Sequence, residues 1–79
     1  MTTPETRIVS EPAILGGKPC VRGTRISVEF LLELIASGAT SPEIVNAYPG
    51  LTAEDVAAAV RYAASALRRA SAVELELSL

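Results

Sequence analysis

The apolar positions near the start of the chain come in short pieces rather than in long periodic runs. Between residues 8 and 26 they are interrupted by Pro12, by Gly16-Gly17 and by Pro19. Short apolar pieces around a Gly-Gly pair are typical of short strands joined by a turn. We therefore expect a small N-terminal β-hairpin.

After the hairpin the spacing of apolar residues becomes helical, and capping signals divide the pattern into three helices. The first helix covers Val28 to Ser37, with Ser27 as its N-cap and Gly38 just beyond its end. The second follows the capping box of residues 40–43 and stops before Pro49-Gly50. The third is expected from about residue 53 to about residue 70.

The third helix has two predicted faces that differ in side-chain size. At 100° per residue, its larger aliphatic side chains and one alanine form a narrow core stripe: Val56, Val60, Ala63 and Leu67. Small residues flank this stripe and would let a second helix approach closely, so we assign them to a dimer interface: Ala59, Ala66 and Ala70. Arg61 and Arg68 are expected together on a different, solvated side.

The two ends of the chain differ from the part between them. Residues 1–7 are polar and are expected to be disordered. Residues 8–70 form the predicted domain. In residues 71–79, apolar and polar residues alternate with a period of two, which predicts a strand or an extended tail.

Size and composition favour one small domain that associates with itself. A chain of 79 residues is short for a large core, yet 49% of its residues are hydrophobic. Apolar surface that so small a core cannot hide is usually covered by a partner, so we expect a homodimer. No apolar run approaches the length of a membrane span, and no signal peptide is visible, which favours the cytoplasm.

The inventory of reactive side chains argues against catalysis. The chain has no histidine and a single cysteine, Cys20, so no imidazole is present to activate the thiol. Its acidic residues do not form a cluster with the spacing of metal ligands. We expect no enzymatic activity, no cofactor and no metal site.

Two longer runs carry a resemblance to a known family. The segments "GGKPCVRGTRISVEFLLELIASG" and "SPEIVNAYPGLTAEDVAAAVRYAA" resemble domain-of-unknown-function family 433, the VapB-like antitoxins, over about residues 8–64. The resemblance implies a mainly α fold: a homeodomain-like helix-turn-helix core of three helices with an N-terminal β element, often dimeric. It also implies an association with a PIN-like ribonuclease toxin.

The basic residues of the hairpin are the predicted DNA-binding residues: Lys18, Arg22 and Arg25. The glycines around them do not have the spacing of a P-loop. The alternative is that these glycines only form a turn and that the basic side chains are merely solvated. Phosphate contacts need only positive charge. In contrast, Glu54 and Asp55 would repel DNA at the start of the third helix, so readout of operator DNA by that helix end is disfavoured.

The predicted toxin-binding residues lie at the end of the chain. They are two arginines and the apolar residues of the tail: Arg68, Arg69, Val73, Leu75, Leu77 and Leu79. An extended tail could add to the toxin as a strand, while the arginines approach its acidic, metal-binding cleft. The alternative is a tail that pairs with the hairpin or with a dimer mate. The chain is thus expected to be an antitoxin that also binds its operator, or alternatively a stand-alone dimeric helix-turn-helix regulator.

Overall fold

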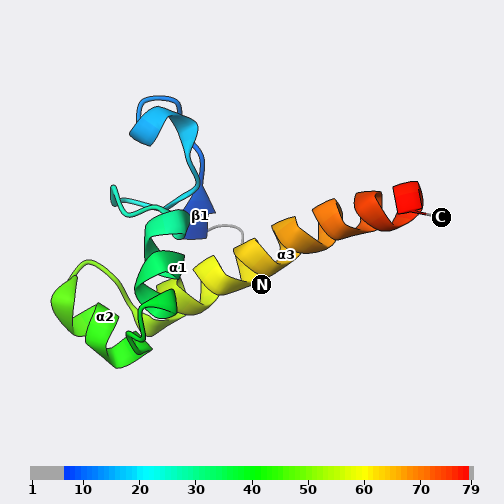
Figure 1. Ribbon diagram of the computed structural model, residues 1–79. Helices are drawn as coiled ribbons and strands as arrows, with labels where there is room; N and C mark the ends of the chain where they lie inside the picture. Colours follow the sequence, from blue (N-terminus) through cyan, green and yellow to red (C-terminus); the bar gives the residue numbers. More distant parts are fainter. Residues whose placement is uncertain (1–6, 79) are drawn as a thin grey trace.

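A small antiparallel sheet and three helices make up the fold. The computed structural model describes residues 7–78, and side chains over residues 7–70. Its elements are β1 (Ile8–Val9), a short 3-10 helix η2 (Leu15–Gly17), β2 (Cys20–Val21), α1 (Val28–Ala36), α2 (Ser41–Ala47) and α3 (Ala53–Ser78). Figure 1 shows that α3 crosses the body of the molecule and continues past it. The chain is therefore mainly helical, as predicted.

The two strands pair as the hairpin prediction required, but their connection is longer than a tight turn. Ile8 lies opposite Val21, and Val9 lies opposite Cys20. The connection contains η2, in which Gly16 and Gly17 have φ angles of 66° and 92°. Glycine adopts such angles without a steric penalty, so the Gly-Gly pair shapes this loop rather than a two-residue hairpin turn.

The starts of α1 and α2 are fixed by the side chains that the sequence identified. The Ser27 hydroxyl accepts a hydrogen bond of 2.9 Å from the Phe30 N–H. In the capping box of α2, the Thr40 N–H donates to Glu43 Oε1 over 2.8 Å. This backbone hydrogen bond, together with one from the Thr40 hydroxyl, lowers the pKa of the Glu43 carboxyl.

The start of α3 is fixed by a capping box that also reaches the N-terminal part of the chain. The Thr52 N–H donates to Asp55 Oδ2 over 3.0 Å, and the Asp55 N–H donates to Thr52 Oγ1 over 3.2 Å. The other oxygen, Asp55 Oδ1, accepts from Arg7 Nη1 at 3.0 Å. Arg7 therefore does not belong to a disordered segment, and that prediction is wrong for this residue because a buried carboxylate holds its guanidinium.

The core lies where α1 and α2 pack on α3, and it includes Val56 and Ala63 of the predicted stripe but not Val60 and Leu67. Ala58 and Ala59 are fully buried, whereas Val60 is 43% exposed and Leu67 is 67% exposed. Alanines at the contact let the helix axes come close, which turns the larger side chains of Val60 and Leu67 outward. The prediction that Ala59 lies in a dimer interface is wrong, because Ala59 is covered within its own chain.

The prediction of an extended C-terminal tail is also wrong, because α3 is helical as far as Ser78. Alternation with a period of two defines one side of a strand, but positions two apart differ by about 200° around a helix. The structure describes side chains only as far as residue 70, so the predicted toxin-binding side chains of Val73, Leu75 and Leu77 are not among them. Leu79 lies outside the described residues altogether. Their contacts with a toxin stay a prediction.

Candidate functional site

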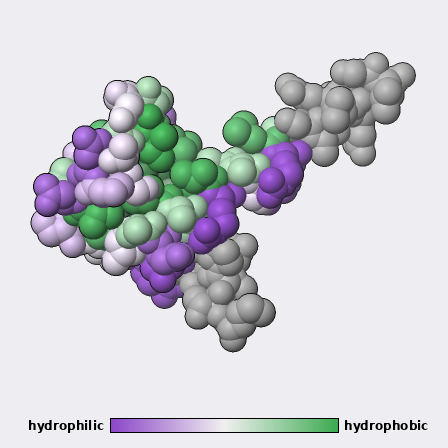
Figure 2. Space-filling model, turned by 90° about the horizontal axis from the view of Figure 1, so that it is seen from below, coloured by the Kyte–Doolittle hydropathy of each residue, from purple (hydrophilic) through white to green (hydrophobic). Residues whose placement is uncertain are grey.

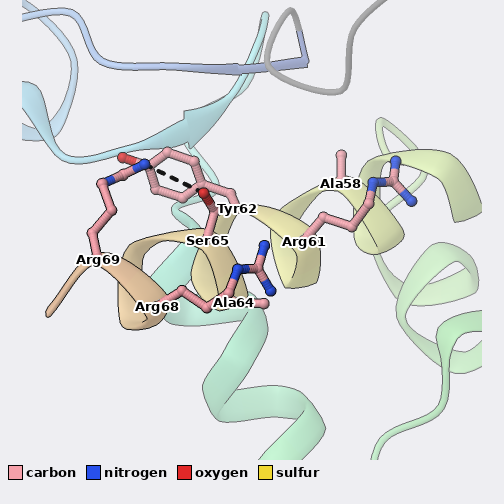
Figure 3. A pocket seen from close by; sticks show the side chains of 7 residues that line it. All are labelled: Ala58, Arg61, Tyr62, Ala64, Ser65, Arg68 and Arg69. Atoms are coloured by element: carbon pink, nitrogen blue, oxygen red, sulfur yellow. Dashed lines mark hydrogen bonds between the residues drawn. The ribbon is translucent and has the colours of Figure 1, made fainter. Parts of the chain in front are cut away.

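A group of arginines forms an exposed basic face on α3. Arg61, Arg68 and Arg69 line one shallow pocket of about 390 Å³, together with Ala58, Tyr62, Ala64 and Ser65 (Figure 3). Arg61 and Arg68 are seven residues apart, which is close to two helical turns, so they share a side as predicted. All three arginines are exposed. We call these three residues the basic face.

The contacts within the basic face leave an excess of positive charge. Arg61 Nη2 lies 3.6 Å from Glu54 Oε1, and both side chains are at least half exposed. Arg69 Nη1 donates to Ser65 Oγ over 3.3 Å. Within residues 7–70, Arg68 takes part in no ion pair. Three guanidinium groups against one carboxylate suit a ligand with carboxylate or phosphate oxygens.

The predicted DNA-binding residues are split between two places. Lys18 Nζ lies 3.3 Å from Glu29 Oε1, so this lysine is paired with the first turn of α1. Arg22 and Arg25 are exposed in the turn after β2. The Arg22 N–H donates to the Arg7 carbonyl over 2.8 Å, and the Thr24 hydroxyl closes the turn by donating to the Val21 carbonyl over 2.8 Å.

The first turn of α3 carries two acidic residues that already have partners within the chain. Asp55 is 8% exposed and caps its own helix, as described above. Glu54 lies beside Arg61. Both carboxylates therefore have partners within the chain, and Asp55 is a capping residue of α3.

A second surface, the α1–α3 groove, is apolar. It has a volume of about 570 Å³ and is walled by Pro19, Val28, Leu32 and Ala36 on one side and by Tyr62, Ala63, Ala66 and Leu67 on the other. Lys18, Ser27, Glu29 and Glu33 line its rim. Figure 2 shows hydrophobic surface continuing from the body onto the projecting part of the molecule. Of the predicted dimer residues, Ala66 lines this groove, and Ala70 is exposed.

In the part of the chain that the structure describes, metal-binding side chains form no cluster and the single thiol is buried. No group of three or more His, Cys, Asp or Glu residues there could hold a metal ion. The Cys20 side chain is 2% exposed, and its thiol donates to the Lys18 carbonyl over 3.1 Å. No helix among the described residues has both the length and the apolar character needed to cross a membrane.

Among the described residues, these features define a small helical domain that carries the basic face and the apolar α1–α3 groove. Residues 8–63 match the family described as "protein of unknown function (DUF433)", and the chain belongs to that family. The resemblance found in the sequence is therefore confirmed at the level of the family.

Two similar proteins support the same assignment. An uncharacterized protein of Sinorhizobium fredii, y4eO, is 42% identical over 56 residues, which are 71% of this chain and 25% of that protein. The chain thus spans about a quarter of that relative's length. The crystal structure of a DUF433 member protein from Anabaena variabilis has a TM-score of 0.70 at 34% identity, covering 92% of this chain and 69% of that one. This fold is therefore shared with a solved member of the family.

Two features of the structure were not predicted from the sequence. The ion pair between Arg7 and Asp55 joins residues 48 positions apart, so no pattern within a short stretch of sequence indicates it. The exposure of Leu67 was missed because a leucine at helical spacing was assigned to the core. The alanines around it were the available signal, since a row of small residues marks the closest approach of two helices.

Proposed function

We propose that this protein is the antitoxin of a type II toxin–antitoxin module, and that it neutralises a PIN-like ribonuclease through the basic face of α3. The observation that carries the proposal is the gathering of Arg61, Arg68 and Arg69 on one exposed side of a helix that projects from the body. The family resemblance supplies the class of partner. On this proposal the protein acts in the cytoplasm.

The chemistry of the basic face fits an acidic, metal-binding cleft. A guanidinium group binds a carboxylate with two parallel N–H donors, and its positive charge competes with a divalent cation for the same oxygens. Arg68, which is exposed and outside the ion pairs of the described residues, is the residue best placed to make such contacts. The antitoxin thus inhibits by occupying the site where the nuclease would hold its metal.

A second candidate is a DNA-binding regulator with a homeodomain-like helix-turn-helix formed by α2, α3 and the residues between them. The observation that favours it is the exposure of Arg22 and Arg25 in the turn after β2. These arginines suit phosphate contacts with operator DNA, which require no sequence readout. The two functions are compatible, because an antitoxin that binds its own operator would use both surfaces.

The two candidates are separated by the matched variants Arg68→Asp and Arg25→Asp. Both replace an exposed arginine by aspartate, but on different surfaces. Arg68→Asp is expected to weaken binding to the cognate nuclease at least about tenfold and to restore its RNase activity, whereas Arg25→Asp leaves both unchanged. Binding is measured by calorimetry with the purified nuclease.

Two other results would favour the DNA-binding regulator over the antitoxin. If the nuclease neither co-purifies with the protein nor is inhibited by it, the antitoxin proposal is wrong. DNA binding that decreases steeply with salt and is lost in Arg25→Asp but kept in Arg68→Asp would then support the second candidate.

A further inference from the structure

We propose that the pocket on the basic face binds one nucleotide of single-stranded RNA, with the phosphates on its arginines and the base on the Tyr62 ring. This activity goes beyond inhibition of a nuclease. It belongs to the free protein and requires no toxin, although it uses side chains of the same face.

The charge of the basic face suits a polyanion. Arg61, Arg68 and Arg69 are all exposed and line one pocket. Among the described residues, the only carboxylate paired with any of them is that of Glu54, which lies 3.6 Å from Arg61. Guanidinium groups bind phosphate oxygens through parallel N–H donors. The basic face therefore offers at least two guanidinium groups to a phosphate chain.

Tyr62 adds an aromatic ring to this pocket. Its side chain is half-buried and lines the pocket together with the three arginines (Figure 3). An aromatic side chain beside arginines is a combination that binds single strands, because the ring stacks on an unpaired base while the guanidinium groups hold the backbone. A carboxylate has no flat apolar face to stack, so the ring favours a nucleic acid over an acidic peptide.

The size of the pocket favours a single strand over a duplex. Its volume of about 390 Å³ is near the lower end of the roughly 300–1,000 Å³ found for pockets that hold small ligands, so it suits one base with its sugar. A duplex keeps its bases stacked, and turning one base out of the stack costs free energy. A single strand can place a base in the pocket without that cost.

The hydroxyl group of Ser65 favours RNA over DNA. Ser65 Oγ accepts a hydrogen bond of 3.3 Å from Arg69 Nη1, and the hydroxyl keeps its own hydrogen as a donor. A ribose 2′-hydroxyl can accept that hydrogen bond, whereas DNA has no oxygen at this position. The pocket thus contains a partner for each part of a ribonucleotide.

The net charge of the chain limits the number of phosphates that take part. Because the formal net charge is -2, long-range attraction does not assist binding, and the contacts are those of the basic face alone. At about 0.7 per phosphate contact, two or three contacts predict a slope of about −1.4 to −2.1 when the logarithm of the association constant is plotted against that of the salt concentration.

The test titrates a fluorescein-labelled, unstructured oligouridine of about ten nucleotides with the full chain and follows fluorescence anisotropy. Arg68→Ala and Arg25→Ala are matched variants, since each removes one exposed arginine, from the basic face or from the turn after β2. Arg68→Ala is expected to weaken binding at least about fivefold. Arg25→Ala should change it by less than about twofold.

Variants of Tyr62 test the stacking contact. Tyr62→Leu keeps an apolar side chain without a ring and should bind at least about fivefold more weakly, whereas Tyr62→Phe keeps the ring and should bind like wild type. Circular dichroism checks that both variants fold. Since the chain has two tyrosines and no tryptophan, Tyr62 is the only tyrosine in a Tyr48→Phe background. Its emission should be quenched by the oligouridine beyond the absorption effect seen with free tyrosine amide.

Several results would overturn the proposal. They are a dissociation constant weaker than about 1 mM for wild type, equal affinity for duplex DNA or for oligothymidine of the same length, and unquenched Tyr62 emission in the saturated complex. Loss of binding in Arg25→Ala but not in Arg68→Ala would place the strand on the turn after β2. Because no measurement includes the nuclease, failure here leaves the proposed inhibition of the nuclease untouched.

Discussion

Replacing Asp55 by alanine tests the connection between the N-terminal part of the chain and α3. The Asp55 carboxylate accepts hydrogen bonds from the Thr52 N–H and from Arg7, both at 3.0 Å. The substitution removes both acceptors and leaves the Thr52 N–H without its capping partner. The residue is only 8% exposed, so water replaces these contacts poorly.

The expected decrease in the free energy of unfolding follows from the loss of these two contacts. Loss of the capping interaction costs about 1 kcal/mol. A hydrogen bond to a charged group contributes about 1.5–3 kcal/mol, and the lower end applies because the Arg7 side chain is 39% exposed. We therefore expect Asp55→Ala to lower the free energy of unfolding by about 2–3 kcal/mol. A domain of this size has about 4–12 kcal/mol in total.

Urea denaturation followed by circular dichroism measures the effect, at one fixed protein concentration for all variants. Glu54→Ala is the matched control, because it removes the neighbouring carboxylate, whose ion pair with Arg61 is exposed at both ends. This control should change stability by less than about 0.5 kcal/mol. A double-mutant cycle of Asp55→Ala with Arg7→Ala separates the ion pair from the helix cap.

Two results would show that the Asp55 contacts do not stabilise the protein in this way. If Asp55→Ala costs no more than Glu54→Ala, the buried carboxylate does not stabilise the start of α3. If the double-mutant cycle gives no coupling energy between Arg7 and Asp55, the N-terminal part of the chain is not held by the ion pair.

Two local features lead to further predictions. Gly38 has a φ of 103°, whereas Gly50 has an ordinary backbone angle, and an added Cβ would meet nothing within 4 Å at either position; Gly38→Ala should therefore cost about 1 kcal/mol in urea denaturation, and Gly50→Ala should be neutral within about 0.5 kcal/mol. Equal effects would exclude backbone strain as the cause. Because hydrogen bonds lower the pKa of Glu43 in the folded state, its contribution to stability is complete above the ordinary glutamate pKa of about 4.3 and is lost as pH falls through the folded value. Glu43→Gln should lack this part of the acid dependence, and identical pH profiles of the denaturation midpoint for the two proteins would contradict it.

The sequence predicted the features that are set by neighbours along the chain. The N-caps Ser27, Thr40 and Thr52 all occur at the expected helix starts. Each cap acts over about three residues, so a short sequence window contains all the information. The grouping of Arg61 with Arg68 was predictable for a similar reason, since it follows from helical spacing alone.

The features that depend on packing were not predictable in this way. Hydrophobicity ranks Val60 and Leu67 above Ala59, but the closeness of α1 to α3 places the alanine inside and the larger residues outside. The alternating residues 71–78 continue α3 because leucine, glutamate and alanine favour helix and an existing helix is easily extended. Arg7 was assigned to a polar end because its partner Asp55 is distant in the sequence.

The angle between Leu67 and Arg68 on α3 has a consequence for how the two surfaces can be used. Consecutive residues of a helix differ by about 100°, so a ligand that lies against Leu67 in the α1–α3 groove leaves Arg68 directed away from it. The two neighbouring residues therefore belong to separate surfaces, and occupation of the groove does not by itself block a contact made by Arg68.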